Sequence, residues 1–137
     1  MSHFTKLDRA QITSADAFIK ACKDLGFTEI QRDVTIKDYY GKSIKVDVAV
    51  KAGKYDIALQ KNESGKFDMV ADWWGVRGAA PELMRKAKIN GDGDLQDYLL
   101  RHTTKHTIVE RYARQGFRAD VTEDAKQNLN VVLTRAY

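Results

Sequence analysis

The segment from Tyr55 to Val76 constrains the fold most, because apolar and polar residues alternate along it with a period of two. Glu63-Ser64-Gly65 interrupts the alternation as a three-residue loop with glycine last, which is typical of a type I turn followed by a G1 bulge. We therefore predict a β-hairpin. Its loop sets the register, with Leu59 opposite Met69 and Ile57 opposite Ala71.

Two further turns precede this hairpin. Tyr39-Tyr40-Gly41 repeats the three-residue pattern and pairs Val34 with Val46. Ala52-Gly53 is a shorter turn that pairs Val50 with Tyr55. A slip of one residue would move the apolar side chains to the wrong face, and these registers avoid that. One face then carries the following apolar residues: Val34, Val46, Val48, Ile57, Leu59, Phe67 and Met69. The sequence predicts a four-stranded antiparallel meander.

Helices and strands flank the meander on both sides. Ser2–Leu7 is predicted as a strand, Ser14 as the N-cap of a helix, and Gly26 as the residue that ends this helix. After the meander, the sequence predicts a loop, two helices and two strands. They are Gly75–Ala80, a short helix Glu82–Lys88 after Pro81, a long helix capped by Asp94, and strands near Arg118–Thr122 and Leu129–Arg135.

We expect one α+β domain spanning residues 1–137. Its length suffices for a single core, and 43% hydrophobic and 31% charged residues are ordinary for a soluble globular protein. The expected architecture is an open antiparallel β-sheet, made of the central four-strand meander plus the terminal strands, with helices packed mainly on one face.

The single cysteine, Cys22, excludes an internal disulfide and suits a reducing compartment. It lies on the apolar stripe of the first predicted helix, so we expect an inert core residue. No apolar run approaches the roughly 18 residues of a membrane span, and the N-terminus lacks the apolar region of a signal peptide. We expect a cytoplasmic location.

Several short motifs, taken in order, are similar to one known family. They are Met1-Ser2-His3-Phe4, Leu25-Gly26-Phe27, Tyr55-Asp56-Ile57, Val70-Ala71-Asp72-Trp73-Trp74-Gly75-Val76 and Gln115-Gly116-Phe117. Together they resemble the proteins of hypothetical chloroplast reading frame thirty-five, a domain of unknown function found in plastid and bacterial genomes. The resemblance implies no activity, cofactor or catalytic residue. It implies an accessory role beside an AAA-type ATPase, and the chloroplast stroma if the gene is plastid-encoded. The chain departs from the family pattern at Arg101–His106 and at Arg77–Asp92.

The predicted registers gather carboxylates on the face opposite the apolar one. Asp33 falls opposite Asp47, and Asp56 falls opposite Asp72. Like charges that face each other destabilise a sheet, so this acid row needs compensation. A basic protein partner would supply it, and Trp74, predicted to point to the same face, would anchor that partner. A solvated face on which the carboxylates splay apart is the plainer alternative.

A divalent cation is another way to compensate the same carboxylates, since hard cations favour oxygen ligands. A metal-dependent enzyme at this acid row is therefore an alternative hypothesis. His102 and His106 lie four residues apart and are weak candidates for metal ligands. Because they lie on the apolar stripe of the long helix, packed or hydrogen-bonded histidines are the plainer interpretation.

Positive charge is concentrated in residues 77–118, which carry 9 Lys or Arg against 5 Asp or Glu. This skew favours an acidic partner or nucleic acid. The candidate nucleic-acid contacts are Arg85, Lys86, Lys88, Arg111, Arg114 and Arg118. A solvated basic helix face is the alternative interpretation.

No phosphate loop, dinucleotide fingerprint, paired-cysteine motif or serine-nucleophile motif occurs in the chain. We therefore expect a non-catalytic binding or accessory module that acts through a protein partner, without a cofactor and without a catalytic residue. The partner-binding residues predicted from the sequence are Asp33, Asp47, Asp56, Asp72 and Trp74. The metal-dependent enzyme and the nucleic-acid-binding protein are the alternatives.

Overall fold

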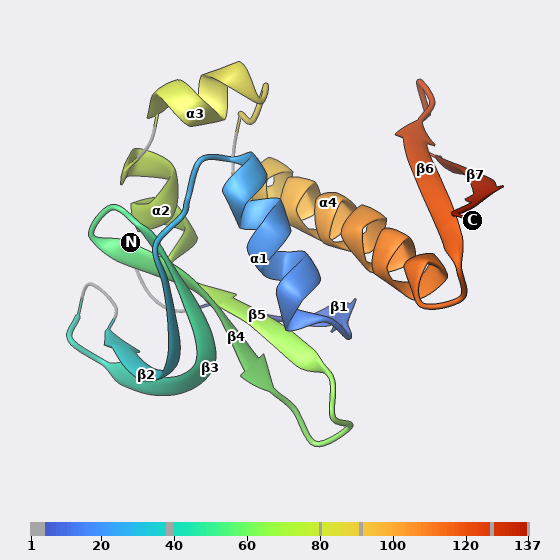
Figure 1. The fold of residues 1–137 in the computed structure, drawn as a ribbon. Coiled ribbons are helices and arrows are strands. Elements are labelled where there is room, and N and C mark those ends of the chain that lie inside the picture. The colour runs from blue at the N-terminus through green and yellow to red at the C-terminus, as the bar shows by residue number, and fades with distance from the viewer. Residues whose placement is uncertain (1–4, 38–39, 80, 91, 127, 137) are drawn as a thin grey trace.

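The computed structural model describes residues 5–37, 40–79, 81–90, 92–126 and 128–136. These residues form eleven helices and strands, shown in Figure 1. In chain order they are β1 (Thr5–Ile12), α1 (Ala15–Asp24), β2 (Ile30–Lys37), β3 (Ser43–Ala52), β4 (Tyr55–Lys61), β5 (Phe67–Ala71), α2 (Trp73–Ala79), α3 (Pro81–Lys86), α4 (Asp92–Ala113), β6 (Phe117–Glu123) and β7 (Leu129–Arg135).

The main sheet has five antiparallel strands in the order β1-β5-β4-β3-β2. The predicted meander is thus confirmed as β2 to β5, and β1 adds the fifth strand beside β5. Helices α1, α2 and α4 lie over one face of this sheet (Figure 1). The α+β fold class, with an open sheet and helices mainly on one face, is confirmed.

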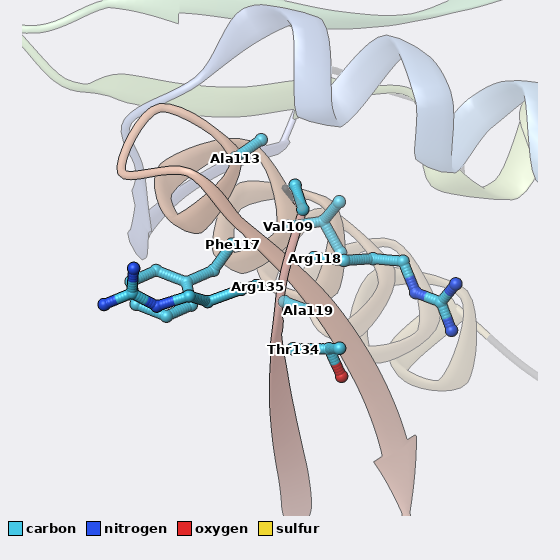
Figure 2. A pocket seen from close by; sticks show the side chains of 8 residues that line it. Val109, Ala113, Phe117, Arg118, Ala119, Thr134 and Arg135 are labelled. Carbon is cyan, nitrogen blue, oxygen red and sulfur yellow. The ribbon is translucent and has the colours of Figure 1, made fainter.

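The last two strands, β6 and β7, form a separate two-stranded sheet instead of extending the main one. This hairpin stands on the far side of α4 (Figure 1). Figure 2 shows Val109 and Ala113 of α4 beside Phe117 and Ala119 of β6, and these residues line a hollow between the helix and the hairpin. Ala119 is buried, so β6 is the strand of the hairpin that packs on the body of the domain.

Most predicted strand registers are confirmed. Val34 pairs with Val46, Leu59 with Met69, and Ile57 with Ala71. One is wrong by two residues, because Ala52 pairs with Tyr55 and the turn consists of residues 53–54. Gly53 has a φ of 76°, as the first loop position of a tight hairpin requires. A shift of two residues leaves each side chain on its predicted face. Of the Tyr39-Tyr40-Gly41 turn, Tyr39 lies outside the described residues.

The prediction that the apolar residues of β2 to β5 share one face is wrong for the second half of β2 and the first half of β3. Val48 and Val50 face the helices in the main core. Val46 instead packs with Ile36 in a second, smaller cluster. The change of face lies beside Asp33, which adopts a left-handed φ of 52° between extended residues. The sheet therefore buries apolar side chains on both faces.

Helix α1 has the predicted ends. The side chain of Ser14 accepts a hydrogen bond from the backbone N–H of Ala17, and Gly26 follows the helix with a φ of 94°. The N–H of Phe27 returns to the carbonyl of Cys22, which satisfies a carbonyl that the helix end would leave unpaired. The buried residues of this helix form the core with α4, α2 and the sheet.

The prediction of a strand through Trp74 followed by a loop at Gly75–Ala80 is wrong. Strand β5 ends at Ala71, and α2 occupies residues 73–79. Asp72 explains the change, because its carboxylate accepts a hydrogen bond from the N–H of Gly75 at 3.2 Å and so caps the helix. Trp73 is buried in the main core.

The remaining predictions hold with shifted boundaries. Pro81 begins α3 as predicted, and the long helix α4 begins at Asp92, two residues before the predicted cap Asp94. Strand β1 extends to Ile12, beyond the predicted end at Leu7, and residues 2–4 of that predicted strand lie outside the described residues. Within the described residues, no helix has the length and hydropathy needed to cross a bilayer.

Candidate functional site: a basic groove between α1 and α4

The four acids of the predicted row occupy separate environments. Asp33 is exposed at the irregularity in β2, and the β2–β3 ladder lacks a pair between Asp33 and Asp47. The carboxylate of Asp47 accepts a hydrogen bond from the backbone N–H of Lys61 at 2.6 Å. Asp47 therefore ties the end of β4 to β3, which is a structural role.

Asp56 is half-buried and lies opposite Lys51 in the β3–β4 ladder. The two-residue change of register produces this pairing of opposite charges, which stabilises neighbouring strands. Burial raises the pKa of the Asp56 carboxyl, the nearby Lys51 lowers it, and Glu29 raises it further. Lys51 is also 4.0 Å from Glu29 in an ion pair.

Asp72, the last acid of the row, is only 1% exposed and caps α2. It therefore does not share an open surface with Asp33 and Asp47. Trp74 lies in the first turn of α2, and its side chain is outside the described part of the structure. The five predicted partner-binding residues thus lie in separate places. Asp33 lies at the irregularity in β2, Asp47 in the middle of β3, and Asp56 in the β3–β4 ladder. Asp72 and Trp74 lie at the start of α2.

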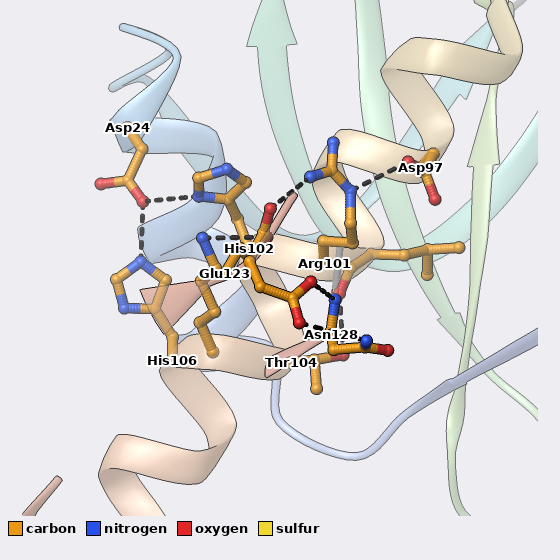
Figure 3. Close-up of polar contacts among 11 residues, drawn as sticks. Asp24, Asp97, Arg101, His102, Thr104, His106, Glu123 and Asn128 are labelled. Atoms are coloured by element: carbon orange, nitrogen blue, oxygen red, sulfur yellow. Dashed lines mark hydrogen bonds and ion pairs between the residues drawn. The ribbon is translucent and has the colours of Figure 1, made fainter. Parts of the chain in front are cut away.

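The two histidines of α4 both approach one carboxylate of α1. Asp24 Oδ2 lies 2.7 Å from His106 Nε2 and 3.8 Å from His102 Nδ1 (Figure 3). The ring of Tyr98 stacks on His102 with centroids 3.9 Å apart. Desolvation lowers the pKa of His102, with Lys105 adding to that effect and Asp24 opposing it. Among the described residues no group of three or more potential ligands can hold a metal ion. The histidines join α4 to the end of α1.

A second set of charges joins α4 to the β6–β7 hairpin. Glu123 of β6 accepts from Arg101 at 2.8 Å and lies 3.0 Å from Lys105 (Figure 3). Arg101 also donates to Asp97 one turn earlier. The hydrogen bond from Lys105 is the main cause that lowers the pKa of Glu123. His102 and Lys105 thus lie on two sides of α4 that are packed against other elements, α1 and β6.

The predicted basic cluster divides into two parts. Arg85 pairs with Glu82 within α3, and Lys88 follows that helix with a φ of 59°, while the side chain of Lys86 lies outside the described residues. Near the other end of α4, Arg118 pairs with Asp120 along β6. Arg111 and Arg114 are exposed and form no ion pair with any residue that the structure describes.

These two arginines line a groove between α1 and the last turns of α4. Two adjoining hollows form the groove, and they share the side chains of Asp16, Arg32, Glu110 and Arg114. The lining includes five cationic side chains and only two carboxylates. The cations are Lys20, Lys23, Arg32, Arg111 and Arg114. The charge excess of residues 77–118 indicates only Arg111 and Arg114, because the other three cations come from α1 and β2.

The side chain of Glu110 joins the two walls of the groove. Ser14 donates to Glu110 Oε2 at 2.8 Å, and Lys20 lies 3.6 Å from Glu110 Oε1. Each oxygen of the Glu110 carboxylate thus contacts a polar side chain from α1 or its N-cap. Arg32 of β2 lies 3.5 Å from the exposed Asp16. The remaining three cations, Lys23, Arg111 and Arg114, form no ion pair with a described residue, so a ligand meets them without displacing an internal partner.

The chemistry available at the groove is recognition of negative charge. Arginine offers a planar set of donors that matches carboxylates and phosphates. Thr13 and Thr107 add hydroxyl groups, and Phe67 adds a half-buried aromatic ring.

Cys22, the one cysteine of the chain, is buried in the main core, and burial raises the pKa of its thiol. A raised pKa disfavours the thiolate that a nucleophile requires.

The protein has a mixed α+β fold with an open sheet, and cationic side chains outnumber carboxylates in its α1–α4 groove. Residues 21–132 match the family described as "Protein of unknown function (DUF1257)", and the chain belongs to that family. The match begins within α1 and ends within β7, so it includes all of α4 and only the last residues of α1. Comparisons with curated proteins and with solved structures gave no match.

Proposed function

We propose that this domain is a non-catalytic binding module that holds an acidic segment of a partner protein in the α1–α4 groove. The observation that carries the proposal is the five-to-two excess of cations over carboxylates in the groove, with Arg111 and Arg114 free of ion pairs among the described residues. Such a surface attracts an acidic ligand and orients it through bidentate contacts.

The lining favours a peptide over a nucleic acid. Asp16 and Glu110 interrupt the positive surface, and a phosphate backbone would pass close to both. Ile19, Ile30 and Phe67 line the same two hollows. Apolar side chains beside cations suit a segment in which acidic and apolar residues alternate.

The proposed contact surface is the groove and not the acid row, because the carboxylates of Asp47 and Asp72 accept hydrogen bonds from the protein's own backbone. The role as an accessory module stays the same. An AAA-type ATPase, the partner class that the family resemblance implies, is the first class to test for an acidic segment of this kind. A cytoplasmic or plastid location is part of the same proposal.

Fluorescence anisotropy with a labelled peptide of alternating Glu and Leu residues tests the proposal. The R111E/R114E variant should bind this peptide at least about tenfold more weakly than the wild type, since about 1.4 kcal/mol corresponds to that factor. Added salt should weaken wild-type binding, because the groove charges are exposed.

The matched control is the R85E/K88E variant, which changes the net charge equally but lies on and beside α3, away from the groove. It should bind like the wild type. Equal losses in the two variants would show that net charge alone attracts the peptide. Tighter binding of single-stranded RNA than of the peptide would favour the nucleic-acid alternative instead.

A further inference from the structure

The outer edge of β7 carries free backbone hydrogen-bonding groups. The Ala136 N–H donates to the Gly116 carbonyl, and the Asp124 N–H donates to the Asn128 carbonyl, so both bonds flank the β6–β7 ladder. Bonds in an antiparallel ladder join every second residue. The backbone N–H and C=O groups of the even-numbered residues of β7 therefore point toward β6. The backbone groups of Leu129, Val131 and Leu133 point away, and no third strand joins this sheet within the described residues.

The same edge lacks the features that usually prevent strand addition. Residues 129–134 contain neither a charged residue nor a proline. Three consecutive apolar residues are exposed, with Val131 at 39%, Val132 at 62% and Leu133 at 41%. An isolated two-stranded hairpin is at best marginally stable. Strand β6 packs on α4 more extensively than β7 does, so β7 gains little stability from the rest of the protein.

We propose that β7 pairs with β7 of a second copy of this chain, in an antiparallel, two-fold symmetric arrangement centred on Val132. Full overlap of the strand Leu129–Arg135 with itself places Val132 opposite Val132 of the second copy and Val131 opposite Leu133. The Val131–Leu133 pairs join residues whose backbone groups point outward, as hydrogen bonding requires, and Val132 meets its counterpart on the axis as a non-hydrogen-bonded pair. The two hairpins become one four-stranded sheet.

The charges on this edge favour a second copy over a foreign strand. Arg135 is the one charged residue of β7, and in this register it faces Leu129 of the other copy. No like charges meet, and the neutral edge offers nothing that would select an acidic or basic partner strand. Apolar side chains face apolar side chains in the three central pairs, which is the self-complementarity that a two-fold interface needs.

Sedimentation velocity with charge-swapped variants tests the register. Wild-type protein should form dimers as its concentration rises, whereas V132K and V132D should each remain monomeric because like charges meet on the axis. An equimolar mixture of V132K and V132D should restore the dimer, since Lys then faces Asp. A T122K variant on β6, on the same face of the hairpin as Val132, should dimerise like the wild type.

Hydrogen exchange of the wild type gives a second measurement that needs no variant. The amides of Val131 and Leu133 should exchange more slowly at high protein concentration, while the Val132 amide, which faces β6, should change little. A wild type that stays monomeric over the whole series would overturn the proposal. Dimers that survive in V132K and V132D separately would place the interface elsewhere and would overturn it as well.

Discussion

The ring of Tyr55 lies directly against the backbone of Gly75. A Cβ atom at position 75 would be 2.4 Å from Cδ2 and 2.6 Å from Cε2 of that ring. Tyr55 begins β4, and Gly75 lies in the first half of α2, so this contact fixes how α2 approaches the sheet. Glycine is required here for space, because any side chain would enter the volume of the ring.

The substitution Gly75→Ala should therefore destabilise the domain. Overpacking of a dense region costs about 1–3 kcal/mol, since the ring or the helix must shift. Urea unfolding followed by circular dichroism measures the change. Gly78→Ala in the same helix is the matched control, because no atom lies within 4 Å of the added Cβ. It should leave the stability unchanged or raise it by up to about 1 kcal/mol. Equal effects of the two substitutions would contradict the steric role of Gly75.

Asp72→Ala should lower the unfolding free energy by about 1–2 kcal/mol, because the start of α2 loses its side-chain cap. The comparison with Asp33→Asn is informative, since both acids belong to the row predicted from the sequence. Asp33 is exposed, and asparagine tolerates its left-handed φ of 52°, so this change should cost little. Chemical denaturation of both variants measures the difference, and a larger loss for Asp33→Asn would contradict the assigned roles.

Ser14→Ala should cost about 1–2 kcal/mol, because it removes the cap of α1 and the hydrogen bond to Glu110 together. A double-mutant cycle with Glu110→Gln separates the two effects. Coupling between the sites is expected, since the Ser14 Oγ and Glu110 Oε2 atoms are in contact. Ser43→Ala at the exposed start of β3 serves as the control. Strictly additive losses would show that the hydroxyl acts only as a cap.

The stability of the domain should fall as the pH drops below the ordinary pKa of histidine, about 6.5. The folded pKa of His102 is lowered, chiefly by desolvation, so the unfolded chain takes up a proton that the folded protein does not bind. The loss stops once the pH is below the folded pKa. His102→Gln should reduce this fall, measured as unfolding free energy against pH. His106→Gln, which keeps His102 in place, should retain it, and the reverse result would contradict the assignment.

Local signals in the sequence predict much of the fold. Alternation and loop length predict β2 to β5, because a side-chain period of two and a glycine at a fixed loop position are short-range constraints. Ser14 and Gly26 predict the two ends of α1 for the same reason. The error at Asp72 is also local in origin. An aspartate at the end of an apolar strand is compatible with continued strand or with a helix cap, and packing of Trp73 into the core decides between them.

The candidate site was less predictable, because it is assembled from residues far apart in the chain. Charge density in the sequence indicates Arg111 and Arg114, but Lys20 of α1 and Arg32 of β2 join them only in the folded protein, where the groove brings α1, β2 and α4 together. The four acids do not form one continuous surface, for a related reason. The predicted row assumed a regular sheet, whereas the left-handed backbone at Asp33 and the register of Lys51 with Asp56 separate the four carboxylates.

Binding of an acidic segment in the α1–α4 groove can be observed residue by residue by NMR shift mapping. The uniformly ¹⁵N-labelled protein is titrated with the Glu/Leu peptide. We expect backbone shift changes confined to the two walls, residues 13–23 and 107–114, with Arg32 included. Shift changes centred on β4 and β5, or none at saturating peptide, would contradict this expectation.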